Sequence, residues 1–228
     1  MGTTDRPRLG VALGGGALRG TAHIGILRAL ERSGLTPDVI AGASMGAVVA
    51  GLYACGWTPD RMEELAVGLE LRDLYDPHLH PGTLLRMAGK VVADFLHLPA
   101  GLLGQPPRGL IAGERIEALL HRWTGGRRVA ECRPRAAFVA VDLLSAERVV
   151  FSAGPSGGRR AQRGGGTNGL RTRAPRTFHL EASTVAEAVR ASIAIPFVFE
   201  PKQLGHRLLV DGGLLDNVPA DVVRGMGA

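Results

Sequence analysis

The chain has 228 residues, of which 45% are hydrophobic and only 4% are aromatic. This length favours a single sizeable domain, and a core of Leu, Val, Ile and Ala favours a compact α/β protein over a disordered chain or a β-sandwich. The formal net charge of +6 would suit a nucleic-acid partner, but its distribution argues against one.

The excess charge lies in one segment, residues 155–177, which contains six Arg and no acidic residue. Its low-complexity Gly/Arg composition, without apolar periodicity, predicts a flexible insertion. Arg-Gly segments can bind RNA, but this one has no aromatic residue on which a base would stack. We therefore expect a solvated insertion and no specific nucleic-acid partner.

The chemistry of the termini and cysteines favours the cytoplasm. Cys55 and Cys132 have neither metal-ligand spacing nor a disulfide-framework pattern, so we expect reduced thiols. The N-terminus turns glycine-rich after a few apolar residues, too few for a secretory signal. We expect a cytoplasmic protein with no metal and no other cofactor.

The first elements alternate between strand and helix. RLGVAL at 8–13 predicts a buried strand that ends in a glycine turn, and the periodicity over 22–32 predicts a helix. A second strand is expected at 39–41 and a helix of small residues at 45–55. Two successive strand–turn–helix units indicate parallel strands with helices packed on the sheet.

The rest of the chain continues as a mixture of helices and strands. Residues 60–100 look helical and include an apolar stretch, for which core packing is the preferred interpretation over a cap on a cleft. We expect further elements, in chain order, as a helix at 114–123, strands at 136–141 and 149–151, a helix opened by the capping box of Thr184 and Glu187 and running to about Ser192, and a strand at 208–210.

The uncharged run 39–57 is long enough to span a bilayer, and Gly42 and Gly46 have the spacing of a membrane helix pair. The run is mostly Gly, Ala and Ser, so its insertion would be weak. A strand followed by a buried helix is the better interpretation.

Ser44 stands in this run as the centre of GASMG, a G-x-S-x-G pattern. At a sharp strand-to-helix turn, such a serine has a strained backbone, and the glycines on both sides avoid collisions with the neighbouring strand and helix. The N-terminus of the helix favours negative charge at the same place. The pattern predicts a nucleophile, although the usual α/β-hydrolase fold needs more strands before it.

Two further turns carry candidate groups. GGGALRG at 14–20 matches neither a dinucleotide loop nor a P-loop, but its backbone N–H groups would form an oxyanion hole beside Ser44. Arg19 could hold this loop or meet an anionic head group. Asp211, in DGG at 211–213, could act as general base to Ser44, and an ordinary Asp-Gly turn is the alternative.

Together these motifs resemble those of the patatin-like phospholipases, and particularly of the bacterial members. The resemblance runs from about Leu9 to the C-terminus and rests on the motifs GGGALRG, TAHIGIL, GASMG, ASIAIPFVFEP and LVDGGLLDNVP. It implies a three-layer α/β/α fold with a mostly parallel central sheet, as a single domain over 8–228 interrupted by the insertion. Because members normally continue beyond RGMGA, we expect a version truncated at the C-terminus.

The resemblance also implies a Ser–Asp dyad without a catalytic histidine, with Ser44 as nucleophile and Asp211 as base. The oxyanion hole falls on Gly15, Gly16 and Ala17. The supporting residues are Gly14, Arg19, Gly20, Gly42, Gly46, Gly212 and Gly213. Two positions depart from the family, because Ala17 and Phe197 stand where members often have glycine, and Phe197 would narrow the acyl site.

The implied function is a serine esterase that hydrolyses lipid esters, with a lipid ester as partner and peripheral contact with a membrane. The alternatives are a catalytically weak lipid- or partner-binding module on the same fold and, third, RNA binding through the insertion. The histidines His23, His179 and His206 are left out of the catalytic set, because His23 is better explained as a loop-fixing residue and His206 falls at the far end of the last strand from Asp211.

Overall fold

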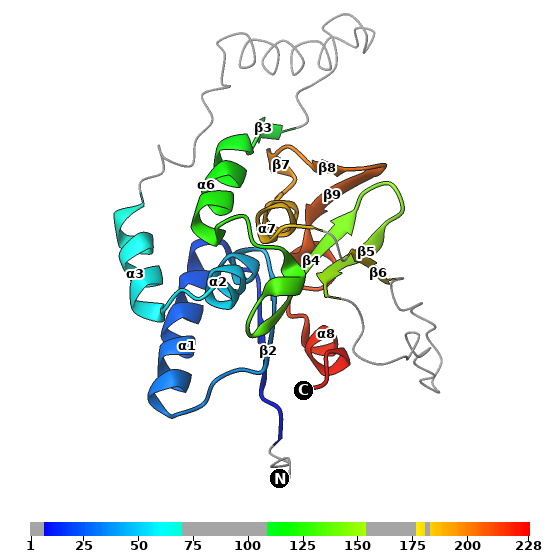
Figure 1. Cartoon of the computed structure of the whole chain (residues 1–228). Helices are drawn as coiled ribbons and strands as arrows, with labels where there is room; N and C mark the ends of the chain where they lie inside the picture. The colour runs from blue at the N-terminus through cyan, green and yellow to red at the C-terminus, as the bar shows by residue number, and fades with distance from the viewer. Residues whose placement is uncertain (1–6, 70–108, 154–176, 181–182) are drawn as a thin grey trace, which may run out of the picture.

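The computed structural model describes residues 7–69, 109–153, 177–180 and 183–228 (Figure 1). Residues 70–100, which include the apolar stretch, lie outside the described residues, and the Arg/Gly-rich insertion lies almost entirely outside them. For both, the sequence-based expectations therefore stay predictions, as does the single-domain boundary 8–228.

The core of the fold is a seven-stranded sheet in the order β1-β2-β4-β5-β6, with β9 paired to β4 and β8 paired to β9. The first three strands of this path are parallel, whereas β4 runs antiparallel to both β5 and β9. A separate parallel pair is formed by β3 and β7. The strands are β1 (Gly10–Leu13), β2 (Val39–Ala43), β3 (Gly109–Ile111), β4 (Arg135–Asp142), β5 (Glu147–Ser152), β6 (Thr177–Leu180), β7 (Phe197–Phe199), β8 (Lys202–Leu204) and β9 (Arg207–Asp211).

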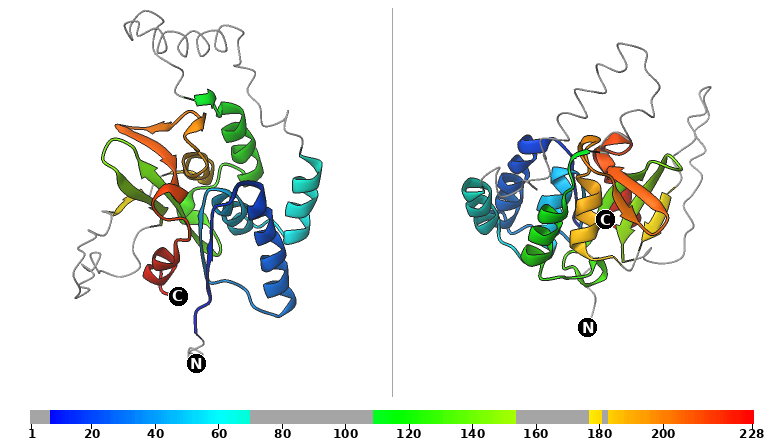
Figure 2. Two further views of the ribbon diagram at one scale, coloured as in Figure 1. Left: turned by 180° about the vertical axis from the view of Figure 1, so that it is seen from behind. Right: turned by 90° about the horizontal axis from the view of Figure 1, so that it is seen from above.

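Helices cover both faces of the sheet (Figures 1 and 2). One face is packed by α1 (Ala22–Arg32), α2 (Met45–Ala54), α3 (Pro59–Gly68), α6 (Glu114–Thr124) and α7 (Val185–Ser192). The other face is covered by α8 (Ala220–Gly225). Three short 3-10 helices are η1 (Ala17–Thr21), η2 (Val129–Glu131) and η3 (Gly212–Leu214). The predicted α/β fold with three layers is confirmed.

The strands are buried because both of their faces carry apolar side chains. Ile40 and Phe138 point into the larger cluster under α1, α2 and α7, whereas Val39 and Val139 point into the smaller cluster under α8. Successive side chains on a strand face opposite sides, so a strand covered on both sides reads as a continuous apolar run. This explains why the sequences VIAGA in β2 and AAFVAV in β4 do not alternate between polar and apolar residues.

Most elements with local signals agree with the predictions. The helix over 22–32 and the capping box of Thr184 and Glu187 are confirmed, and the other predicted strands and helices whose ends are described differ by at most two residues at an end. Within the described residues, no helix is both long and apolar enough to cross a membrane, and α2 has only 10 residues.

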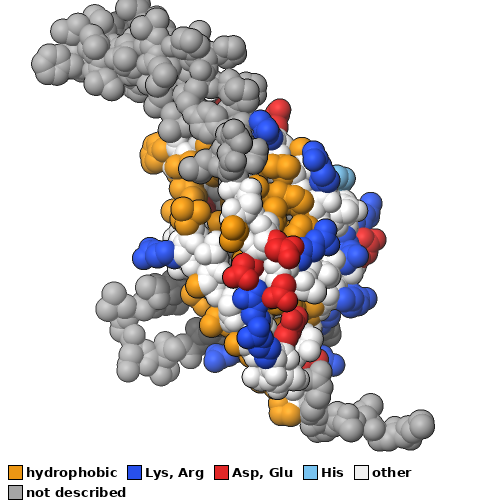
Figure 3. Space-filling model, turned by 90° about the vertical axis from the view of Figure 1, so that its left-hand side faces the viewer, with side chains coloured by type: hydrophobic (Ala, Val, Ile, Leu, Met, Phe, Trp, Pro, Cys, Tyr) orange, Lys and Arg blue, Asp and Glu red, His pale blue; other side chains and the backbone are white. Residues whose placement is uncertain are grey.

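The outer surface of α1 and α3 is charged. Arg28 on α1 forms ion pairs with Asp60 and Glu63 on α3, at 2.8 and 2.6 Å. Figure 3, which views the molecule from this side, shows acidic and basic side chains side by side in the lower half of the face and hydrophobic ones gathered higher up. The two helices therefore present an ordinary solvated face outward.

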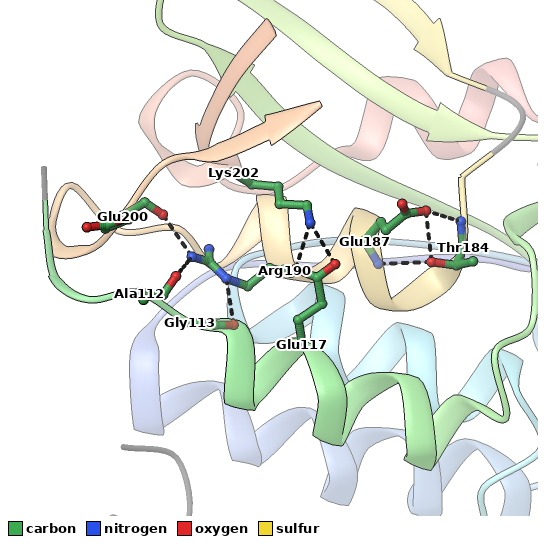
Figure 4. Close-up of polar contacts among 8 residues, drawn as sticks. All are labelled: Ala112, Gly113, Glu117, Thr184, Glu187, Arg190, Glu200 and Lys202. Carbon is green, nitrogen blue, oxygen red and sulfur yellow. Dashed lines mark hydrogen bonds and ion pairs between the residues drawn. The ribbon is translucent and has the colours of Figure 1, made fainter. Parts of the chain in front are cut away.

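Arg190 on α7 ties three segments together (Figure 4). Its side chain is 2% exposed, and its guanidinium donates to the carbonyl oxygens of Gly113, Ala112 and Glu200 at 3.0, 2.6 and 2.8 Å. The last two residues adjoin β3 and β7, so this one cation holds the small β3–β7 sheet and the start of α6 against α7. Nearby, Lys202 pairs with Glu117 at 2.6 Å on a half-buried surface.

We predict that Arg190→Met lowers the free energy of unfolding by about 3 kcal/mol or more, because buried carbonyl oxygens lose their donors. The matched change Lys202→Met removes a partly exposed ion pair and should cost no more than about 1 kcal/mol. Urea denaturation of both variants measures the difference. Equal losses would show that Arg190 is not the anchor of this region.

Candidate active site

Ser44 occupies a sharp turn between β2 and α2. Its φ of 53° and ψ of −126° lie in a region that non-glycine residues rarely adopt, and the side chain is 6% exposed. This is the strained strand-to-helix turn that the G-x-S-x-G pattern predicts.

Gly42 and Gly46 bring α2 against the strand backbones. A Cβ atom on Gly42 would collide with the carbonyl of Gly46, and one on Gly46 would collide with the carbonyl of Leu13 on β1. No side-chain rearrangement relieves a collision with backbone. The glycines are therefore required by packing, and they fix the position of Ser44 at the end of the sheet.

Asp211 is brought to Ser44 by strand β4. Strand β2 ends with Ala43 paired to Val139, and β9, running the opposite way, ends with Asp211 paired to Ala140, the next residue of β4. The two strands thus meet end to end along one edge of β4. The nucleophile candidate and the base candidate, 167 positions apart in the chain, become neighbours through the register of this one strand.

The Asp211 carboxyl is buried. It is 6% exposed, and its Oδ1 accepts a hydrogen bond of 2.7 Å from the Gly213 N–H. Burial raises the pKa of Asp211, and hydrogen bonding with Ser44 and Gly213 offsets part of that rise. Oδ2 is buried and receives no hydrogen bond of standard length and angle from the described residues. Such a desolvated oxygen is more basic than a solvated carboxylate, as a general base requires.

Ser192, at the end of α7, fixes the turn at Ser44. Its Oγ accepts a hydrogen bond of 2.9 Å from the Ser44 N–H and donates one of 2.6 Å to the carbonyl oxygen of Val139 on β4. The side chain is 0% exposed. Sequence reasoning missed this residue: it lies in the motif ASIAIPFVFEP, but nothing local indicates a contact across 148 positions.

The glycine loop lies against Ser44. A Cβ atom on Gly15 would stand 3.0 Å from the Ser44 Cβ. The Gly15 N–H donates to the side-chain and backbone oxygens of Asn217 at 3.1 and 3.2 Å, and His23 Nε2 bonds the Gly14 carbonyl oxygen at 2.8 Å. Asn217 was not predicted, although it stands in the motif LVDGGLLDNVP. The loop is therefore anchored from both sides.

The two departures from the family pattern occur where the backbone is left-handed. Ala17 has φ 48° and Phe197 has φ 68°, the region that glycine adopts without strain. The Phe197 side chain is 86% exposed, so the expectation that it narrows the acyl site is wrong: the ring points into solvent.

The remaining candidates are placed as follows. Arg19 has an exposed side chain, and its N–H donates to the Gly16 carbonyl oxygen at 3.0 Å. Gly20 packs against Met45, Gly212 against the backbone of Val139. His206 is exposed in the turn before β9, at the opposite end from Asp211, and His179 belongs to β6, which β4 and β5 separate from β2.

Metal ligands are not gathered anywhere in the part of the chain that the structure describes: no group of three His, Cys, Asp or Glu side chains there could hold an ion.

Comparison with known proteins identifies the family. A family model described as patatin-like phospholipase matches residues 11–224, so the chain belongs to the patatin-like phospholipase family. An uncharacterised NTE family protein of Mycobacterium tuberculosis is 33% identical over 225 residues, covering 99% of this chain and 48% of that protein. Patatin-like phospholipase domain-containing protein 6 of Mus musculus is 26% identical over 224 residues, covering 96% of this chain and 13% of that protein.

Among solved structures, VipD from Legionella pneumophila has the same fold, with a TM-score of 0.50 and 17% identity over 95% of this chain and 47% of that one. The chain spans about half the length, or less, of the curated relatives that it matches.

We predict that Ser192→Ala leaves the buried Ser44 N–H without its acceptor and lowers the free energy of unfolding by about 1–3 kcal/mol. Hydrolysis of any ester substrate should fall as well, because the turn loses its fixed geometry. Ser183→Ala, at a serine that is also buried but precedes α7 at its far end, is the control. Thermal unfolding and turnover, measured side by side, test this; unchanged turnover in Ser192→Ala would contradict it.

Proposed function

We propose that the protein hydrolyses carboxylic esters of lipids, with Ser44 as nucleophile and Asp211 as general base. The observation that carries this proposal is the end-to-end meeting of β2 and β9 on β4, which sets Ser44 beside a buried carboxyl whose pKa is raised. Membership of the patatin-like phospholipase family supports a lipid ester as the substrate class.

In the first step, Asp211 takes the proton from the Ser44 hydroxyl as Oγ attacks the ester carbonyl. The tetrahedral intermediate collapses, the proton passes from Asp211 to the leaving alcohol, and an acyl-enzyme remains. In the second step, Asp211 takes a proton from water, the hydroxide displaces Ser44, and the carboxylic acid leaves. Ser44 recovers its proton, so the dyad is restored without a metal, a cofactor or a histidine.

The negative charge that develops on the carbonyl oxygen needs backbone donors. In this proposal the N–H groups of Gly16 and Ala17 provide them, together with the N-terminus of α2, while the Gly15 N–H holds the loop on Asn217. In this arrangement Gly15 donates no hydrogen bond to the oxyanion and instead fixes the position of the loop that carries the two donors. A left-handed residue at Ala17 turns the chain there, consistent with a loop shaped for an anion.

Replacing Ser44 by Ala should reduce hydrolysis of a soluble short-chain ester by several orders of magnitude, because one essential nucleophile is lost. The fold should persist, since alanine fits the space of serine. Ester turnover and circular dichroism are measured on the same preparation. A folded variant that keeps more than about 1% of the wild-type turnover would show that Ser44 is not the nucleophile.

The raised pKa of Asp211 makes a second prediction. The base acts only when ionised, so ester turnover should fall as the pH drops through this raised pKa. The pH–activity profile of His23→Gln should show the same fall in acid. Because the pKa of Asp211 is higher in the folded than in the unfolded chain, its protonated form stabilises the fold at acidic pH, and this stability is lost as the pH rises from the unfolded pKa to the folded pKa. Asp211→Asn should therefore abolish activity. At neutral pH its melting temperature should be at least that of the wild type, and any increase in melting temperature should disappear at acidic pH. If Asp211→Asn retained activity, Asp211 would not be the general base and would serve only in the turn.

A catalytically weak lipid- or partner-binding module remains the alternative function. It is distinguished by the same assays, because such a module would bind lipid but hydrolyse no ester in the wild-type form.

A further inference from the structure

Two cysteines lie side by side at the end of α2 that is farther from Ser44. Cys55 is the residue at which α2 ends, and Cys132 directly follows η2. Both are free thiols, as the sequence predicts; Cys132 is 0% exposed, whereas Cys55 is partly exposed. The proposed hydrolysis uses neither of them, so the pair needs an explanation of its own.

The backbone brings the two cysteines together. The peptide N–H that follows Cys132, on Arg133, donates a hydrogen bond of 3.0 Å to the carbonyl oxygen of Ala54. That carbonyl belongs to the peptide group that precedes Cys55. The same connection joins a non-hydrogen-bonded pair of residues in an antiparallel sheet, whose Cα atoms stand about 4.5 Å apart with their side chains close. A disulfide requires a Cα separation of about 4.4–6.8 Å, so this backbone arrangement suits one.

The two thiols interact, and they do so unequally. The hydrogen bond with the Cys132 thiol, followed by the charge of Arg127, lowers the pKa of Cys55, and burial offsets part of this effect. The same hydrogen bond, together with burial, raises the pKa of Cys132. The C-terminus of a helix disfavours an anion, so the lowered pKa of Cys55 comes from these neighbours and not from α2.

The inequality gives each sulfur a different chemical role. A cysteine that reacts with oxidants has a lowered pKa and is accessible to solvent, and a second cysteine beside it resolves the first product into a disulfide. Cys55 meets the first description. Cys132 is buried and is held as a thiol in contact with Cys55, which suits the second role.

We propose that Cys55 and Cys132 form a reversible disulfide when the protein meets a peroxide, with Cys55 as the attacking residue and Cys132 as the resolving residue. Helix α2 has 10 residues, so the pair lies about 15 Å along the helix from the turn at Ser44. The oxidation therefore takes place outside the candidate active site and does not depend on the proposed function.

The reaction has two steps, here written for hydrogen peroxide. The Cys55 thiolate attacks one peroxide oxygen, an S–O bond forms as the O–O bond breaks, and the released hydroxide takes a proton and leaves as water. The Cys132 sulfur then attacks the sulfenic acid on Cys55. The S–S bond forms, the S–O bond breaks, and the hydroxide leaves as a second water with the Cys132 thiol proton. The two sulfurs lose two electrons in all, and one peroxide is reduced to two waters.

The disulfide would join positions that are 77 residues apart, and the loop it closes contains α3, β3 and α6. A crosslink over such a long loop stabilises a protein mainly by restricting the unfolded chain. Since the backbone already has a suitable spacing, little strain should oppose this gain. We expect the oxidised protein to melt about 5 °C or more above the reduced protein.

The test oxidises the folded full chain with hydrogen peroxide after complete reduction with dithiothreitol. Remaining thiols are alkylated, and the protein is digested without reduction. Mass spectrometry should find one peptide pair joined through Cys55 and Cys132, which disappears after dithiothreitol treatment. The melting temperature should rise with oxidation and return with reduction.

Cys132→Ala and Cys55→Ala form a matched pair of variants, because neither can form the disulfide. Peroxide should therefore raise the melting temperature of neither. They should differ with dimedone, which traps sulfenic acids. Cys132→Ala should be labelled at Cys55, whereas Cys55→Ala should stay unlabelled because Cys132 is buried.

A folded wild type that forms no Cys55–Cys132 peptide pair would overturn the proposal, and this result needs no variant to fold. A pair that forms only after unfolding in urea, or a link between two chains in non-reducing electrophoresis, would contradict it as well. Equal dimedone labelling of the two variants would show that the assigned roles are wrong. None of these measurements uses ester hydrolysis, so failure of the proposed function is detected separately.

Discussion

The close approach of α2 to the backbones of β1 and β2 is the constraint on which the site depends. It exists because Gly42 and Gly46 have no side chain, and any Cβ there would strike a backbone carbonyl. With the helix this close, the connection is a single turn, and Ser44 takes a φ of 53°. The same contact directs the N-terminus of α2 toward the serine, so strained geometry and a favourable field for an anion have one cause.

The site is assembled at a cost in stability that the rest of the fold offsets. The backbone at Ser44 is strained, and Asp211 is buried with one oxygen that receives no standard hydrogen bond from the residues that the structure describes. Strain and desolvation of this kind persist only where surrounding contacts over-determine them. Ser192 supplies part of that support through its hydrogen bonds to Ser44 and Val139. The fully buried rings of Phe138 on β4 and Phe151 on β5 hold these two paired strands in the core.

Local signals predicted much of this structure. The two strand–turn–helix units, the capping box at Thr184 and the serine turn follow from periodicity, glycine and capping chemistry within a few residues. The two-stranded β3–β7 sheet and strand β8 were not predicted, because three-residue strands have no readable period. Helix α8 was missed for the same reason, being only 6 residues long.

Contacts between distant segments could not be predicted either. The bonds of Ser192 to Ser44 and of Asn217 to Gly15 join residues 148 and 202 positions apart, and no local sequence pattern indicates either contact. Phe197 shows the opposite case: the sequence marked it as unusual beside the family pattern, but its direction into solvent depends on a backbone angle that the sequence does not state.

In the proposed reaction, Ser44 forms a covalent acyl-enzyme. This step is tested most directly by treating the folded protein with a fluorophosphonate, which phosphonylates an activated serine, and locating the adduct by peptide mass spectrometry. We expect one adduct per chain, on the peptide that contains Ser44, and none after prior unfolding. An adduct on another residue, or an unlabelled protein that still hydrolyses esters, would contradict it.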